Sequence, residues 1–142
     1  MDFRQKALLV LKEQGFRITK QRRMVVNVLA SVDSALSAHE IKQSLDAKGE
    51  RIDLASIFRI LNCLESNGLV HRLVSQAKVA RCSLLNESNA CHHFFVCDSC
   101  RQVYELTCSE PITTHLSQSG FSIKKHSLEL TGLCRACGAI DE

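Results

Sequence analysis

Hydrophobic side chains recur at helical spacing through the first part of the chain. Residues 2–14 form one such run, which Gly15 ends. Thr19 is a suitable N-cap for a second helix, whose inner face carries apolar side chains from Met24 to Leu29. The pattern predicts two amphipathic helices at the start of the chain.

Two more helices are predicted around a short turn. Ser37 and Glu40 have the spacing of a capping box, so a third helix begins there and runs to about residue 48. Asp53 can cap a fourth helix, and Gly68 can end it. Two helices joined by a tight turn that contains glycine are typical of a helix-turn-helix.

Strand-like patterns follow these helices. Residues 69–74 and 79–85 are rich in aliphatic and β-branched side chains and flank a polar stretch, which predicts a β-hairpin and hence a winged helix. Strands are also predicted at 92–97, 103–107 and 121–130, with a short helix near 111–119 that begins at Pro111.

The polar, turn-prone stretch at 86–90 separates the two patterns, and 142 residues suffice for two small domains. We expect an α+β protein: a winged helix-turn-helix DNA-binding domain at 1–85, a hinge at 86–90, and a small α/β dimerisation and metal-binding domain at 91–142.

The net charge of +3 is unevenly distributed. Residues 1–86 contain 14 Lys and Arg against 8 Asp and Glu, whereas residues 87–142 contain 4 against 7. The basic first part is suited to a polyanion, although a solubilising surface gives the same balance.

No stretch has the apolar length of a signal peptide or membrane span, so we expect a cytoplasmic protein without a membrane segment. In a reducing compartment, 8 cysteines point to metal ligands or redox chemistry rather than to structural disulfides.

Two C-x-x-C knuckles carry the strongest chemical signal. They are Cys97 with Cys100 and Cys134 with Cys137, separated by 33 residues. Two such knuckles can complete a tetrahedral site for structural Zn²⁺ with no open position. A thioredoxin-like redox pair is the alternative.

A second metal site is predicted at the hairpin. A turn centred on Gln76 and Ala77 places His71 directly opposite Cys82, at a separation that suits two ligands of one metal. Glu105 and one histidine of the next strand are expected to complete this regulatory site. That histidine is His92 or His93, which point to opposite faces of their strand. Nitrogen, sulfur and oxygen donors together suit Zn²⁺ better than a hard metal such as manganese.

A further metal site is a weaker prediction. Its candidate ligands are Cys91, His93, Glu110, His115 and His126.

The fourth helix is predicted to enter the major groove of double-stranded DNA, where Ser56 and Arg59 face the bases. The basic side chains before and within the second helix are expected to hold phosphates, although a solvated helix start explains them equally well. They are Arg17, Lys20, Arg22 and Arg23.

Four stretches carry a family resemblance. They are Arg17-Ile-Thr-Lys-Gln-Arg22, Leu54-Ala-Ser-Ile-Phe-Arg59-Ile-Leu, His92-His-Phe-Phe-Val-Cys-Asp-Ser-Cys100 followed by Glu105, and His126-Ser-Leu-Glu-Leu-Thr-Gly-Leu-Cys134-x-x-Cys137. In this order they resemble the ferric uptake regulator family over nearly the whole chain. The spacing of His71, Cys82 and Glu105 is most similar to its zinc uptake regulator branch.

The resemblance implies a homodimer that binds a palindromic operator when its regulatory metal is bound, and that represses zinc-uptake genes. An iron- or peroxide-sensing regulator is the alternative, but iron-sensing members tend to carry a carboxylate where Cys82 stands. The chain departs from the family pattern at Lys20, where proline is usual after Thr19, and at Phe58, where tyrosine is common.

Two functions of other classes make different demands. A zinc-dependent hydrolase needs an open metal position and a general base, and the sequence has neither H-E-x-x-H nor a deaminase-like H-x-E with P-C-x-x-C. A thiol redox switch would use Cys91, Cys108 or the knuckles. We therefore expect a protein that is not an enzyme and has no small-molecule substrate.

Overall fold

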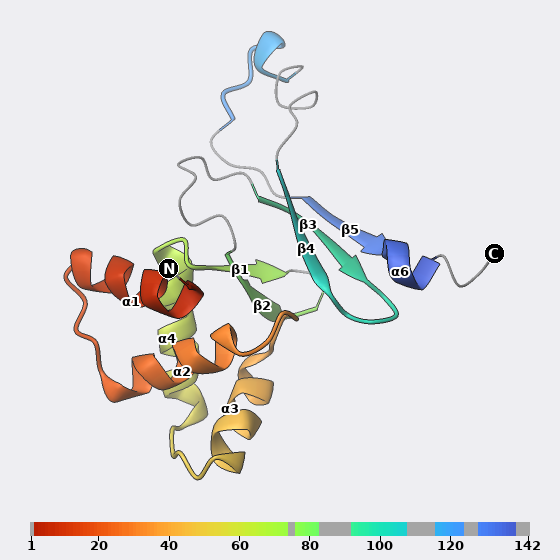
Figure 1. The fold of residues 1–142 in the computed structure, drawn as a ribbon. Helices are drawn as coiled ribbons and strands as arrows, with labels where there is room; N and C mark the ends of the chain where they lie inside the picture. Colours follow the sequence, from red (N-terminus) through yellow and green to blue (C-terminus); the bar gives the residue numbers. More distant parts are fainter. Residues whose placement is uncertain (1, 74–75, 83–91, 108–115, 124–127, 139–142) are drawn as a thin grey trace. The chain divides into compact units, whose positions relative to one another are not determined.

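The computed structural model describes residues 2–73, 76–82, 92–107, 116–123 and 128–138 (Figure 1). The chain divides into two compact units, residues 1–87 and 88–142. The predicted hinge at 86–90 lies outside the described residues and stays a prediction. No helix in the described part has both the length and the apolar content needed to cross a membrane.

The first unit begins with the predicted helices. They are α1 (Phe3–Glu13), α2 (Lys20–Ala30), α3 (Ala38–Ala47) and α4 (Leu54–Ser66). Thr19, Ser37 and Asp53 cap the last three of them, because each side chain accepts a hydrogen bond from the backbone N–H three residues ahead. Ser37 and Glu40 form the predicted capping box.

The helices pack around an apolar core. Val25, Val28, Ile57 and Leu64 are buried, as their helical spacing predicts. Ile52 joins the same core from the turn between α3 and α4. Because each helix buries only the stripe that faces its neighbours, the outer side of α4 stays open to solvent.

Strands β1 (Val70–Leu73) and β2 (Lys78–Arg81) form the predicted antiparallel hairpin. Leu36 pairs with Val79 through two backbone hydrogen bonds of 2.9 and 2.8 Å, which join the hairpin to the segment before α3. Helices α1–α4 and this hairpin make a winged helix-turn-helix, which confirms the predicted fold class.

The hairpin register differs from the prediction. His71 lies opposite Ala80, and the N–H of Cys82 donates to the carbonyl of Leu69 at 2.9 Å. The prediction that His71 and Cys82 are directly opposed is therefore wrong by two residues.

The turn explains this difference. The last strand pair is Leu73 with Lys78, so the hairpin is centred between positions 75 and 76 rather than between Gln76 and Ala77. A centre one residue earlier shifts every cross-strand pair by two residues. Ala77 has a φ of 51°, a left-handed conformation that cannot continue a strand. Side chains alternate between faces, so a shift of two residues keeps His71 and Cys82 on the same face.

The second unit contains a three-stranded sheet. Its elements are β3 (His92–Cys97), β4 (Val103–Thr107), β5 (Leu128–Gly132) and the short helix α6 (Arg135–Gly138). The strand order is β4-β3-β5, with β4 antiparallel and β5 parallel to β3.

Two predicted elements of this unit differ in extent from the structure. Residues 116–118 are helical, and the rest of the predicted helix before them lies outside the described residues. The strand predicted at 121–130 is wrong at its start, because residues 121–123 have no regular structure and β5 begins at Leu128.

One face of this sheet is apolar and open to solvent. The register forms two rows across the strands, Leu106 with His93 and Leu128, and Tyr104 with Phe95 and Leu130. Their members on β4 and β5 are 39 to 44% exposed. On the opposite face, Phe94 and Val96 are buried. A contiguous exposed apolar face of this kind is typical of a protein–protein interface.

Candidate metal centres and nucleic-acid interface

Four cysteine thiols meet at one edge of the sheet in the second unit. Strands β3 and β5 are parallel, with Cys97 opposite Gly132, so the turns after both strands lie at the same edge. Cys97 ends β3 and Cys100 lies in the turn after it, while Cys134 directly precedes α6 and Cys137 lies within it. All four Sγ atoms lie within 4.8 Å of one another.

The geometry of these thiols fits tetrahedral Zn²⁺. The Sγ atoms of Cys100 and Cys134 are 3.9 Å apart. Zn–S bonds of about 2.3 Å in a tetrahedron separate two sulfurs by about 3.8 Å. The Sγ of Cys97 also accepts N–H groups from Cys100 at 3.5 Å and from Cys134 at 3.4 Å, which stabilise a thiolate. The structure thus brings together the four cysteines that the sequence predicted, and four thiolates leave no position for a substrate.

The four thiols do not ionise alike. Backbone N–H groups of Cys100 and Cys134 lower the pKa of Cys97 to about 6, and the N–H of Cys137 lowers the pKa of Cys134. The thiol of Cys134 raises the pKa of Cys137 to about 12. For Cys100, the N–H of Gln102 lowers the pKa, but burial and the Cys97 thiol raise it, and the net shift is upward. Four thiolates this close repel one another, and a divalent cation removes that repulsion.

The wing holds a second pair of metal-ligating side chains. His71 on β1 is half-buried, and Cys82 directly after β2 is 3% exposed. They offer a ring nitrogen and a thiol within 4.8 Å of each other. The diagonal placement therefore still suits two ligands of one metal, although two ligands are only half of a tetrahedral set.

In the second unit, the register separates the two candidate histidines. Glu105 on β4 lies opposite Phe94, on the face of the even-numbered positions of β3, which include position 92. His93 lies opposite Leu106, on the other face. The side chain of His92 lies outside the described residues, as do Cys91, Glu110, His115 and His126 of the further predicted site.

The N-terminal half of α4 carries a chain of polar contacts. The hydroxyl of Ser56 bonds to the carboxylate of Asp53, and the guanidinium of Arg59 bonds to the Ser56 hydroxyl. Ser56 is only 7% exposed, whereas Arg59 and the neighbouring Phe58 are exposed. Of the two predicted base-facing residues, Arg59 therefore lies at the surface and Ser56 lies beneath it.

The basic side chains before and within α2 differ from one another. Arg17, Lys20 and Arg23 are exposed. Arg22 is half-buried, donates from Nη1 to the carbonyl of Arg17 at 2.6 Å, and lies 5.5 Å from the ring centre of Phe16. Three of the four predicted phosphate contacts are thus exposed, and Arg22 has partners within the protein.

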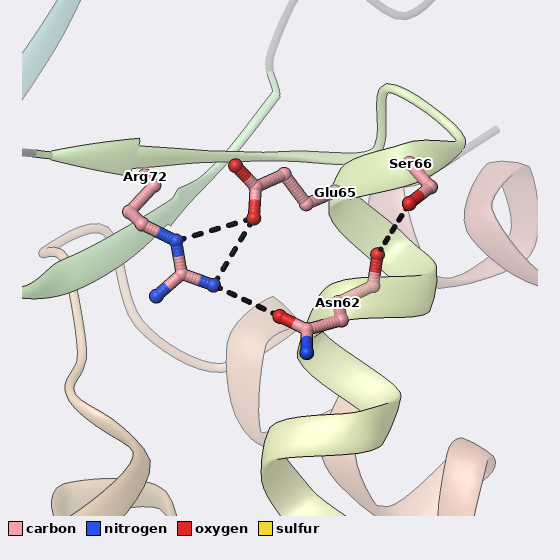
Figure 2. Close-up of polar contacts among 4 residues, drawn as sticks. All are labelled: Asn62, Glu65, Ser66 and Arg72. Atoms are coloured by element: carbon pink, nitrogen blue, oxygen red, sulfur yellow. Dashed lines mark hydrogen bonds and ion pairs between the residues drawn. The ribbon is translucent and has the colours of Figure 1, made fainter.

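An ion-pair cluster between α4 and the wing was missed by sequence reasoning (Figure 2). Arg72 of β1 donates from Nε and Nη2 to one carboxylate oxygen of Glu65 at 3.2 and 3.0 Å, and from Nη2 to the side-chain oxygen of Asn62 at 3.2 Å. We call Asn62, Glu65 and Arg72 the wing clamp. It joins the C-terminal half of α4 to β1 across seven residues of sequence, a spacing that no local pattern marks.

The winged helix with exposed basic side chains, together with a sheet that carries a four-thiol site, defines a metal-binding winged-helix protein. The sequence profile of the ferric uptake regulator family matches residues 13–131. The chain belongs to this family, whose members are transcription regulators.

Individual relatives agree with this assignment. The chain is 32% identical to the zinc uptake regulation protein of Mycobacterium tuberculosis (strain ATCC 25618 / H37Rv) over 133 residues, which cover 87% of this chain and 95% of that protein. It is 27% identical to the peroxide operon regulator of Bacillus subtilis (strain 168) over 136 residues, covering 92% and 90%. A solved structure of a zinc uptake regulator complexed with zinc and DNA has a TM-score of 0.84 at 26% identity, covering 97% of this chain and 94% of that one.

Proposed function

We propose that the protein is a zinc-responsive, DNA-binding transcriptional repressor of zinc-uptake genes that acts in the cytoplasm. The observation that carries this proposal is the buried thiol of Cys82 beside His71 in the wing. A thiolate ligand favours Zn²⁺ over iron or manganese at a mixed site. The likeness to zinc uptake regulators, one of them complexed with zinc and DNA, supports the same conclusion.

The regulatory zinc site is proposed to combine both units. His71 and Cys82 supply two ligands, and Glu105 with one histidine of β3 supplies the others. The shared strand face of Glu105 and position 92 favours His92 over His93. His93 is then left for the further site with Cys91, Glu110, His115 and His126.

The homodimer is proposed to form on the exposed apolar face of the second unit. Tyr104, Leu106, Leu128 and Leu130 supply its surface. Two copies of one apolar face can cover each other about a two-fold axis, and a two-fold dimer matches a palindromic operator.

DNA is proposed to meet α4 in the major groove. Arg59 would read base edges, with Ser56 beside it, while Arg17, Lys20 and Arg23 hold phosphates and Arg22 supports them.

When the regulatory ligands are occupied, zinc cross-links the wing to the dimerisation domain. Both winged helices are then held at an angle that reaches two successive half-sites. Linkage requires that DNA tightens zinc binding by the same factor by which zinc tightens DNA binding. We expect no enzymatic activity, because the four thiolates leave no open metal position.

Metal content and DNA affinity test this proposal together. We expect at least two zinc ions per chain by elemental analysis, one fewer in Cys82→Ala, and loss of zinc-dependent DNA binding in that variant. Cys63→Ala is the matched control, because Cys63 on α4 is a half-buried free cysteine outside both ligand groups. It should behave like the wild type.

The alternatives give different results. Iron in the second site, or metal-catalysed oxidation of a liganding histidine, would support an iron or peroxide sensor. A single zinc in both the wild type and Cys82→Ala would leave only the four-cysteine site and contradict a regulatory zinc at the wing. Zinc release with disulfide formation under mild oxidant would support a redox switch.

A further inference from the structure

Ser56 is unusual in its environment. Ser56 is buried, with 7% of its surface exposed, and the other polar or charged residues that the structure describes are at least partly exposed. A buried hydroxyl requires hydrogen-bond partners. It has two charged ones, Oδ1 of the N-cap Asp53 at 2.5 Å and Nη2 of Arg59 on the same helix at 2.9 Å.

The direction of these hydrogen bonds is determined by chemistry. An ionised carboxylate only accepts, and a guanidinium only donates. Ser56 must therefore donate its proton to Asp53 and accept from Arg59. The hydrogen bond from Ser56 lowers the pKa of Asp53, to which the charge of Arg59 also contributes, so the carboxylate stays ionised at neutral pH. Both bonds are charge-assisted, and each polarises the other.

This chain of bonds holds Arg59 at the exposed surface of α4. The guanidinium has five N–H donors, and the Ser56 bond uses one of them. The remaining donors include a pair with the geometry that matches O6 and N7 of guanine in the major groove.

We propose that Asp53 and Ser56 are positioning residues that hold Arg59, before DNA arrives, in the orientation in which it reads a guanine. This inference rests on the proposed DNA-binding function and deepens it. It also revises the sequence-based expectation for Ser56, which acts through Arg59 and does not itself contact DNA. The conformational entropy of the long Arg59 side chain is then lost during folding, so DNA binding does not have to offset that loss.

The test begins with DNA chosen by the protein itself. The zinc-loaded wild type selects a duplex from a randomised pool, and each guanine of that duplex is then replaced by adenine. Arg59 reads the guanine whose replacement by adenine weakens DNA binding of the wild type but does not weaken DNA binding of Arg59→Ala. Affinities for both duplexes are measured for the wild type, Ser56→Ala, Arg59→Ala and the double variant.

We expect Ser56→Ala to weaken binding to the selected duplex about three- to tenfold, the range that corresponds to immobilising one long side chain. Its discrimination between guanine and adenine should fall by a similar factor. In the Arg59→Ala background, Ser56→Ala should have no further effect. An equal loss in both backgrounds would overturn the proposal, because Ser56 would then act on DNA independently of Arg59.

Two variants separate positioning from folding. Ser56→Thr keeps the hydroxyl and should restore both affinity and discrimination. Ser66→Ala removes a hydroxyl at the far end of the same helix, where it donates to the carbonyl of Asn62 at 2.9 Å (Figure 2), and should leave both unchanged. A loss of discrimination in Ser66→Ala equal to that in Ser56→Ala would assign the effect to general weakening of α4 and overturn the proposal.

Asp53→Asn gives an independent signature. Asparagine caps a helix as well as aspartate does, so α4 keeps its cap. Removing a negative charge should strengthen binding to unselected DNA while discrimination at the Arg59 guanine falls. A parallel rise in affinity for selected and unselected DNA, with discrimination intact, would overturn the role of Asp53.

A measurement without DNA distinguishes failure of this inference from failure of the proposed function. NMR relaxation of the Arg59 Nε should show a more ordered side chain in the wild type than in Ser56→Ala. Equal order in the two proteins overturns the positioning role even if DNA binding is confirmed. Selection that enriches no sequence overturns the proposed function, and this inference with it.

Discussion

The two groups of metal ligands are built in different ways. The four-cysteine site draws its ligands from two turns at one edge of one sheet, and all four thiols lie within a single compact unit. Among its described residues, the wing offers two such side chains, His71 on β1 and Cys82 directly after β2, in the other unit. A complete ligand set suits a metal that stabilises a fold. A partial set needs further ligands from elsewhere in a protein. A metal that recruits them can change how the parts of that protein are arranged.

The largest effect is expected when the complete set is broken. Cys134→Ser removes a thiol that is 7% exposed and accepts the N–H of Cys137. Binding of structural zinc contributes about 10 kcal/mol or more to folding, so the second unit should lose its packed structure. Elemental analysis should show one zinc fewer, and hydrogen exchange should show loss of protection in β3 and β5. Retained protection would show that this sheet is stable without metal, and would remove the contrast between the two sites.

Chelation should separate the two sites without mutation. Increasing chelator concentration should remove the wing metal first, because mixed ligands from a partial set hold it less tightly than four thiolates of one unit. DNA affinity should fall in this first step, while hydrogen-exchange protection of β3 and β5 persists until the second. Simultaneous loss of both metals, of DNA binding and of protection would contradict the division into regulatory and structural zinc.

A smaller effect is expected at the wing clamp. Arg72→Met keeps most of the alkyl chain but removes the bonds to Glu65 and Asn62 (Figure 2). Arg72 and Glu65 have side chains 39 and 40% exposed, so solvent screens the pair. Loss of the clamp should therefore lower stability by only about 0.5–1 kcal/mol.

Hydrogen exchange can measure this change locally, as reduced protection of the β1 and β2 amides relative to those of α1. Lys42→Met provides the comparison, because it removes the pair with Asp46 and the bond from Lys42 Nζ to the carbonyl of Ile52, neither of which involves the wing. If Lys42→Met exposed the wing amides as much as Arg72→Met does, the clamp would not be specific to the wing.

The smallest effect concerns pH and the contact between β2 and α3. Burial raises the pKa of Glu40, but hydrogen bonds from the N–H of Ser37 and from Lys78 outweigh it, so the net pKa lies below the ordinary value of 4.5. A lowered pKa contributes stability that is present above the ordinary value and is lost as pH falls through the native pKa.

Glu40→Gln should thus lower stability by less than about 1 kcal/mol at pH 7, since the pair with Lys78 is exposed. The difference between variant and wild type should shrink as pH falls below 4.5, as urea unfolding at several pH values can measure. A difference that stays constant down to pH 3 would show that Glu40 acts through its shape and not through its charge.

Local sequence patterns determined most of the first unit. Thr19, Ser37 and Asp53 cap helices because their side chains reach backbone N–H groups only three residues away, and such contacts need no tertiary structure. The two C-x-x-C knuckles were equally visible, because each places two thiols in one turn. Family membership followed from the same local motifs in their order along the chain.

Contacts between distant residues were decided only by the tertiary structure. The hairpin register depended on where Ala77 turns the chain, so His71 came to lie opposite Ala80 rather than Cys82. The wing clamp depended on the approach of β1 to α4. These arrangements join segments whose separation in sequence carries no signal of its own. A sequence therefore determines which side chains are available and which local turns they form, and packing decides which of them meet.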